Sequence, residues 1–156
     1  HKRAAPRRCE VTHMNVSFFL KPKAEVVYVY DTDTVSCALK RMAESGFTAV
    51  PVITQKGRYV GTITEGDFLR LLLEHPLEQA ENMPLSEVNR RVHHRSCAID
   101  AHMEDLVELV SDQNFVPVMD GRGTLCGIVT RRDVIRQLSE SYKQVSEQLK
   151  QTEKKH

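Results

Sequence analysis

The sequence lacks the features that mark several classes of protein. Its four cysteines, Cys9, Cys37, Cys97 and Cys126, are scattered without a Cys-x-x-Cys pair, so neither a zinc cage nor a disulfide framework is indicated. This pattern favours a reduced, intracellular setting. No apolar run approaches the roughly 20 residues that a membrane-spanning helix needs, and Phe18–Leu20 is far too short for a signal-peptide core. We therefore expect a soluble, cytoplasmic protein with no membrane partner.

Strong charge of one sign is also missing. The formal net charge is +1 at pH 7 for 156 residues, so the composition makes no general case for nucleic acid or an anionic membrane as a partner. The sequence has no His-Glu-x-x-His motif, no Walker loop and no nucleophile with a base at local spacing. We therefore expect no enzymatic activity, no metal site and no required cofactor.

What the sequence does contain is a repeat. The segments Gly61–Asp67 (GTITEGD) and Gly127–Asp133 (GIVTRRD) both fit the pattern Gly-x-h-Thr-x-x-Asp, where h is apolar, and they lie 66 residues apart. Internal duplication at a fixed offset indicates two similar structural units. With 40% hydrophobic residues, the chain can bury one sizeable core or two small ones packed together.

Each copy predicts the order strand, helix, strand, strand, helix. In the first copy the expected strands are 26–30, 47–53 and 59–64. The first expected helix carries apolar positions at 35, 38, 39 and 42, and the second, 67–73, carries them at 68, 69 and 71–73. Asp31 and Asp33 are the expected N-caps of the first helix, and Gly46 is its expected end. Pro51 belongs at the edge or the entry of a sheet, because it lacks an N–H to donate.

The second copy repeats this order. The expected strands are 95–99, 115–119 and 125–130, and Asp100 is the expected cap of a helix with apolar positions 103, 106, 107 and 110. The closing helix is longer than its twin, because apolar residues continue in alternating steps of three and four beyond Ile135 as far as Leu149. Cys37 and Cys97 are expected to be small core residues.

The expected division of the chain follows from these patterns. Residues 1–13 are basic and are interpreted as a disordered leader or tag, with no function assigned. Residues 14–75 form the first motif, 76–84 a polar linker with one helical turn, 85–142 the second motif, and 143–156 an extended helix or tail. A short helical turn is also expected at 15–20, ahead of Pro22.

The doubled Gly-x-h-Thr-x-x-Asp turn, with a Val-Pro-Val strand in each half, resembles a tandem cystathionine-β-synthase (CBS) domain pair, or Bateman module. The resemblance covers about residues 14–142. The chain is similar to the small stand-alone bacterial proteins of this family. It implies an α/β (α+β) fold in which the two motifs pack with pseudo-two-fold symmetry. It also implies a regulatory module that binds adenine nucleotides between the motifs and alters a regulated protein partner.

The resemblance also implies a set of ligand-binding residues, which lie at the start of the first two strands and at the strand-to-helix turn of each copy. In the first copy they are Val26, Val27, Tyr28, Phe47, Thr48, Ala49, Val50, Pro51, Thr64 and Asp67. In the second copy they are Ser96, Cys97, Ala98, Phe115, Val116, Pro117, Thr130, Arg131, Arg132 and Asp133.

The chemistry of the two turns supports this interpretation. An aspartate such as Asp67 or Asp133 can accept two hydrogen bonds from a ribose diol. A helix N-terminus attracts phosphate, and Arg131 and Arg132 add positive charge there, whereas the first copy has Glu65 at the matching place. A phosphate should therefore favour the second turn, and the first turn would hold only a nucleoside end.

Plain structural interpretations stand beside these. Asp67 and Asp133 could be N-caps only, and Arg131 and Arg132 could form a solvated face. The pair 93–94, two histidines among arginines, is more typical of a surface than of a metal or phosphate site, because adjacent residues of a strand point to opposite faces.

The identity of the ligand stays open between two candidates. AMP, ADP or ATP offers a free ribose diol to the two aspartates. Cyclic di-AMP has its 3′ oxygens esterified, yet the Phe47–Ala49 segment and the Thr130–Arg132 turn resemble proteins that bind it. We expect a linear adenine nucleotide ahead of cyclic di-AMP. A ligand-free protein interaction module is the alternative from another class.

A homodimer is the expected assembly. The two helices that follow the turns carry more apolar residues than one small core needs, so their outer faces are expected to pack against a second copy. These residues are Phe68, Leu69, Leu72, Leu73, Val134, Ile135 and Leu138.

Overall fold

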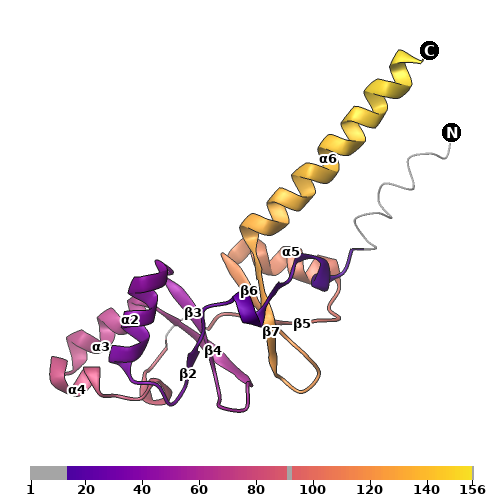
Figure 1. The fold of residues 1–156 in the computed structure, drawn as a ribbon. Helices are drawn as coiled ribbons and strands as arrows, with labels where there is room; N and C mark the ends of the chain where they lie inside the picture. Colours follow the sequence, from indigo (N-terminus) through magenta and orange to yellow (C-terminus); the bar gives the residue numbers. More distant parts are fainter. Residues whose placement is uncertain (1–13, 91–92, 156) are drawn as a thin grey trace.

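The computed structural model of the chain describes residues 14–90 and 93–155 and contains two similar units (Figure 1). The first unit consists of β2 (Val29–Tyr30), α2 (Val35–Ser45), β3 (Ala49–Ile53), β4 (Tyr59–Thr64) and α3 (Glu65–Glu74). The second consists of β5 (Cys97–Ala98), α5 (Met103–Asp112), β6 (Phe115–Met119), β7 (Leu125–Thr130) and α6 (Arg131–Lys154). The predicted α/β fold and the predicted order of elements are confirmed.

Each unit has its own small sheet. The first has the order β2-β3-β4, with β2 and β3 parallel and β3 and β4 antiparallel. The second has the order β5-β6-β7, with the same pairing, and one further strand beyond β7. Side chains on one face of each sheet enter a separate hydrophobic core.

The two hairpin tips join the sheets with two-fold symmetry. The amide of Tyr59 donates to the carbonyl of Gly123 at 3.0 Å, and the amide of Leu125 donates to the carbonyl of Gly57 at 2.9 Å. Both donors and both acceptors are related by the same 66-residue offset as the turns. The backbone contact between the units therefore follows the duplication.

The first strand of each unit is shorter than the sequence predicted. Strands were expected at 26–30 and 95–99, but only Val29–Tyr30 and Cys97–Ala98 are strands. Their partners on the central strands begin at Val52 and Val118, directly after Pro51 and Pro117. A proline has no N–H to extend the ladder, so pairing ends there.

The expectation for Pro51 was therefore wrong in one respect. Its strand, β3, is central in the sheet and not at an edge. The proline is tolerated because the neighbouring strand β2 starts to pair one residue later, at Val52. No donor is needed at Pro51 on that side.

Two expected helix caps were also wrong. Thr34 caps α2 by accepting from the amide of Cys37 at 3.2 Å, while Asp33 accepts from the amide of Tyr30 at 2.8 Å and so closes the preceding turn. Helix α5 begins after His102 and not after Asp100, with no side-chain cap. The end of α2 at Gly46, with φ of 74°, is as predicted, because glycine favours this left-handed conformation.

The segment that precedes the first unit packs against the second unit. The predicted turn before Pro22 is a 3₁₀ helix, η1 (Val16–Phe19), and it is followed by β1 (Lys21–Pro22) and the 3₁₀ turn η2 (Lys23–Glu25). Strand β1 pairs antiparallel with β7, and η1 contributes buried side chains to the second core. The predicted range 14–75 therefore includes residues that pack on the second unit.

The connection between the units packs on the first core. It contains α4 (Leu77–Glu81), which is the expected helical turn of the linker, and the 3₁₀ turn η3 (Leu85–Glu87). Ala80, Leu85 and Val88 are buried in the core of the first unit. Residues 85–88, expected in the second motif, therefore stabilise the first.

Two cysteines and the long helix α6 differ in how far they are covered by the rest of the fold. Cys97 is buried as expected, whereas Cys37 is exposed on α2, so its assignment to a core was wrong. Helix α6 starts on the second unit and then extends well beyond it (Figure 1). In the described part of the chain, no helix is both long enough and apolar enough to cross a membrane.

Candidate functional site

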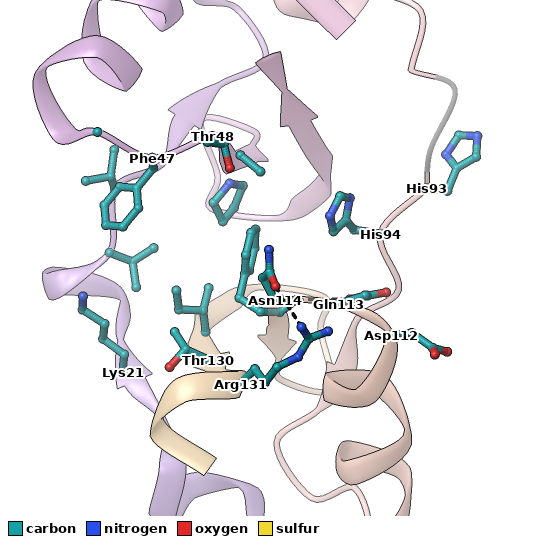
Figure 2. Close-up of a pocket in the computed structure, with 17 residues that line it drawn as sticks. Lys21, Phe47, Thr48, His93, His94, Asp112, Gln113, Asn114, Thr130 and Arg131 are labelled. Carbon is teal, nitrogen blue, oxygen red and sulfur yellow. Dashed lines mark hydrogen bonds between the residues drawn. The ribbon is translucent and has the colours of Figure 1, made fainter. Parts of the chain in front are cut away.

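A cavity of about 620 Å³ lies between the two units (Figure 2). Its volume falls within the range of roughly 300–1,000 Å³ that is typical of small-molecule sites. One wall comes from the first unit and the other from the second. The lining residues are Lys21, Val26, Val27, Gly46, Phe47, Thr48, Ala49, Pro51, His93, His94, Asp112, Gln113, Asn114, Phe115, Ile128, Thr130 and Arg131.

Flat and apolar side chains form one part of the cavity. Phe47, Val26 and Val27 approach from the first unit, and Phe115 approaches from the second. The ring of His94 stacks on the ring of Phe115, with a centroid distance of 5.7 Å and an interplanar angle of 19°. Surfaces of this kind suit the faces of an aromatic base.

His94 has an unsatisfied polar atom in this part of the cavity. Its Nδ1 is buried and has no hydrogen-bond partner among the described residues. Burial lowers the pKa of His94 below its ordinary value of 6.5, and the negative charge of Asp67 opposes that shift. The imidazole is therefore neutral near pH 7, and it presents its ring to the cavity.

The start of α6 forms a polar part of the cavity. Thr130 is the N-cap of this helix, and its hydroxyl accepts from the amide of Asp133 at 3.1 Å. The amide of Arg131 donates to the carbonyl of Asn114, so this N-terminus offers an anion such as phosphate the amide of Arg132 and the positive end of the helix dipole. Lys21, which lies on β1 next to β7, adds a second positive charge to the same cavity as Arg131.

Arg131 is held by the end of α5. Its Nε donates to the carbonyl of Val110 at 2.6 Å, and its two terminal nitrogens donate to the carbonyl of Ser111 at 3.2 Å and to Oδ1 of Asn114 at 3.1 Å. These bonds place a cation where the carbonyls of α5 are unpaired, which stabilises the helix end. Because a guanidinium has five N–H donors, two remain for a ligand.

The matching turn of the first unit is closed. Thr64 and Asp67 form a capping box, in which the amide of Thr64 donates to Asp67 at 2.9 Å and the amide of Asp67 donates to Thr64 at 3.2 Å. Asp67 also forms an ion pair with Arg70, and its side chain is only 1% exposed. The cavity beside it measures about 50 Å³, far less than a nucleotide needs.

Asp133, the twin of Asp67, lies outside the large cavity. Its carboxylate is 27% exposed and forms an ion pair with Arg136 one turn along α6. Instead of lining the cavity between the units, it lines a separate depression beside η1. Arg132 is exposed and is not part of the cavity lining.

The structure brings together about half of the residues that the sequence singled out. Those that line the cavity are Val26, Val27, Phe47, Thr48, Ala49, Pro51, Phe115, Thr130 and Arg131. Those that do not are Tyr28, Val50, Thr64, Asp67, Ser96, Cys97, Ala98, Val116, Pro117, Arg132 and Asp133. Val50 and Val116 are buried in the two cores instead, because neighbouring residues of a strand face opposite sides.

Sequence reasoning missed several lining residues. Asn114 is the 66-residue twin of Thr48, so the repeat itself could have identified it. The backbone shows the same equivalence, because the amide of Glu65 donates to the carbonyl of Thr48 and that of Arg131 to the carbonyl of Asn114. Lys21 reaches the cavity only because β1 joins the second sheet, which no local signal reveals. His93 and His94 were interpreted as surface residues; both line the cavity, and His93 is exposed while His94 is half-buried.

The sequence matches a known protein family. The family model for the CBS domain matches residues 19–74 and 85–140. The chain belongs to the CBS-domain family and contains two such domains in tandem, as the resemblance predicted.

Three similar proteins show the range of the family. A crystal structure of CbpB in complex with c-di-AMP has a TM-score of 0.85 at 22% identity and covers 95% of this chain and 99% of that one. A structure of CBSX2 in complex with AMP has a TM-score of 0.68 at 24% identity, covering 82% and 98%. These likenesses concern the fold.

The third is a curated relative, the A-adding tRNA nucleotidyltransferase of Aquifex aeolicus (strain VF5), which is 31% identical over 109 residues. The match covers 69% of this chain but spans only 12% of the enzyme.

Proposed function

We propose that this chain is a regulatory module that binds an adenine nucleotide in the cavity between its two CBS domains. The observation that carries the proposal is the 620 Å³ cavity, which combines Phe47, Phe115 and His94 with Thr130 and Arg131. The base stacks between the aromatic residues, and the phosphate lies near the helix N-terminus and Arg131. Relatives of the same fold crystallised with c-di-AMP and with AMP support this class of ligand.

The position of the cavity suggests how binding is converted into regulation. Its walls come from both domains, so a bound nucleotide contacts both at once. A ligand that binds one arrangement of the domains more tightly shifts the population toward it. The module therefore changes shape or partner affinity on binding and carries out no reaction. A regulated protein partner and a cytoplasmic location stay predictions.

The choice between nucleotides rests on the two aspartates. A linear nucleotide was favoured because Asp67 and Asp133 could both accept from a free ribose diol. Asp67 is buried in a capping box, and Asp133 pairs with Arg136 outside the cavity. Cyclic di-AMP is therefore a second candidate of equal standing, since it needs no carboxylate for a diol and would use the two cations Lys21 and Arg131.

Calorimetric titration of the full chain with AMP, ADP, ATP and cyclic di-AMP tests the proposal. We expect at least one to bind, and Ala49→Phe, which fills the cavity, to abolish that binding. Ala98→Phe is the matched control, because Ala98 is exposed on β5 and lies outside the cavity lining. Absence of binding by all four would favour the ligand-free interaction module instead.

We also propose a homodimer that buries the outer face of α3 together with the start of α6. Leu69, Leu72 and Leu73 are exposed on α3, and Ile135 is exposed on α6. Phe68 and Val134, which the sequence placed in this surface, are buried in the two cores and do not belong to it. Exposed apolar residues grouped on a helix face are typical of an interface. Light scattering that returned the monomer mass would contradict the dimer.

A further inference from the structure

The part of α6 that extends beyond the second domain has a heptad repeat. Residues 135–141 read IRQLSES, 142–148 read YKQVSEQ and 149–155 read LKQTEKK, so each heptad starts with an apolar residue followed by a cation and a glutamine. The apolar series continues through Tyr142, Val145 and Leu149, and the polar Thr152 takes the next position in the series. We call these four residues the α6 seam. Figure 1 shows this part of the helix standing away from the rest of the fold.

The period of the seam is that of a helix paired with another helix. A series with strict steps of three and four repeats every 3.5 residues, whereas an isolated α-helix turns once in 3.6. The seam stays aligned with a partner only when two helices supercoil around each other. Tyr142 is 76% exposed and Leu149 is 44% exposed, so these two seam residues are largely uncovered in the single chain.

Most residues beside the seam are uncharged. Ser139, Ser141, Ser146 and Gln148 lie at the positions that face the partner helix in a coiled coil, and only Glu153 and Lys155, at the last turn, carry charge there. On the outer face, Arg136 and Lys143 precede Glu140 and Glu147 by four positions, a spacing at which opposite charges interact within one helix. An identical helix therefore approaches the seam without like-charge repulsion.

A depression beside the seam extends the contact surface. It measures about 680 Å³ and lies between η1 and α6, lined by Met14, Asn15, Ser17, Phe18, Ser141, Gln144, Val145 and Gln148. Phe18 is exposed on its rim. Residues 1–13 precede Met14, but they are strongly basic, whereas the lining of the depression contains no acidic residue to attract them. A helix with the composition of α6 matches it better.

We propose that the α6 seam pairs with the α6 seam of a second copy of this chain as a short two-helix coiled coil. This contact is separate from the proposed α3 surface and from the nucleotide cavity. Pairing would also stabilise the end of α6. A helix that packs against nothing is only marginally stable in water, because most helical stability in proteins comes from packing.

Sedimentation velocity of the full chain over a concentration series tests the pairing. All proteins carry Leu69→Lys and Leu73→Lys, which removes the proposed α3 contact and leaves association through α6. We expect this parent to dimerise, and Leu149→Lys to raise its dissociation constant at least about tenfold, because it places a charge in the seam. Gln151→Lys is the matched control, with the same charge change on the outer side of the same turn, and should leave dimerisation unchanged.

Three results would overturn the proposal. The first is a parent chain that stays monomeric throughout the series. The second is a Leu149→Lys variant that dimerises as tightly as its control. The third is a chain that dimerises only after residues 1–13 are deleted, since that would make the chain's own leader the occupant of the groove. Leu149 lies outside both cores, so the thermal unfolding of the variant checks that the domains remain folded.

Discussion

The turns 61–67 and 127–133 share a glycine, a threonine and an aspartate at the same spacing, but they have different surroundings. At the first turn, Asp67 is buried in a capping box and an ion pair beside a cavity of about 50 Å³. At the second, Thr130 and Arg131 line a cavity of about 620 Å³. A duplicated motif therefore keeps its backbone role in both copies, while its availability to a ligand depends on what packs around it.

The segments that cover the two strands explain part of this difference. At Gly61 the neighbour is the side chain of Arg90, whose guanidinium lies where a Cβ would be. At Gly127 the neighbour is the backbone of Lys21, which pairs with β7 as strand β1. In the second unit the neighbour is a strand, β1, which brings Lys21 to the cavity. In the first unit the neighbour is the side chain of Arg90, which lies over the sheet.

The two glycines give the largest expected contrast. A Cβ at Gly127 would lie 2.0 Å from the carbonyl oxygen of Lys21, a backbone atom that cannot move without breaking the β1–β7 pairing. A Cβ at Gly61 meets the end of the flexible Arg90 side chain, so the contrast lies in what each Cβ meets, because the two glycines share a positive φ of 157° and 159°. We expect Gly127→Ala to lower the free energy of unfolding by about 3 kcal/mol and Gly61→Ala by about 1 kcal/mol. Urea denaturation measures both, and equal losses would contradict the comparison.

Substitutions of the two aspartates should also differ in the free energy of unfolding, by less than those of the two glycines. Asp67→Asn removes the charge from a buried ion pair and weakens a reciprocal cap, so we expect a loss of about 2 kcal/mol. Asp133→Asn affects a partly exposed ion pair and should cost about 0.5 kcal/mol. A larger loss at Asp133 would show that the second turn, and not the first, is the structural one.

The adjacent arginines should differ in nucleotide binding. Arg131→Ala removes a cation from the cavity, two bonds to the end of α5 and one to Asn114, so the dissociation constant should rise about tenfold, or about 1.4 kcal/mol. Arg132→Ala should have little effect, because that residue is exposed outside the cavity lining. Calorimetry on both variants, with thermal unfolding as a control for folding, makes the test. Equal effects would show that the turn acts only through its net charge.

The smallest expected effect is a dependence of stability on pH at His94. Burial lowers the pKa of His94 in the folded chain, so the unfolded chain takes up a proton first as the pH falls through 6.5. The free energy of unfolding should therefore decrease below pH 6.5 and level off below the folded-state pKa, with no contribution above 6.5. His94→Gln should show a shallower decrease as the pH falls below 6.5. An identical pH profile for the variant would contradict this assignment.

Much of the fold could be predicted from the sequence because the repeat and the apolar periodicity are local signals. The strands at 59–64 and 125–130, the end of α2 at Gly46 and the order of elements all follow from them. The pairing of β1 with β7 could not be predicted, because two residues carry no pattern and the contact joins distant parts of the chain. For the same reason Lys21 was missed as a cavity residue.

The candidate site was harder to predict than the fold. A carboxylate three residues after a threonine is equally suited to a ligand and to a helix N-terminus, and only burial and partners distinguish the two. Asp67 is satisfied within its own turn, and Asp133 pairs along α6. His94 was misjudged because its neighbours in sequence are charged, whereas its neighbour in space is Phe115.

The central claim is that one nucleotide binds per chain, at the second turn and not at the first. NMR titration of the full chain with the tightest of the four nucleotides tests it most directly. We expect large shifts of the amide signals of Thr48, Asn114 and Arg131, saturating at one nucleotide per chain, while those of Glu65 and Asp67 stay in place. Large shifts at Glu65 and Asp67, with saturation at two nucleotides per chain, would contradict it.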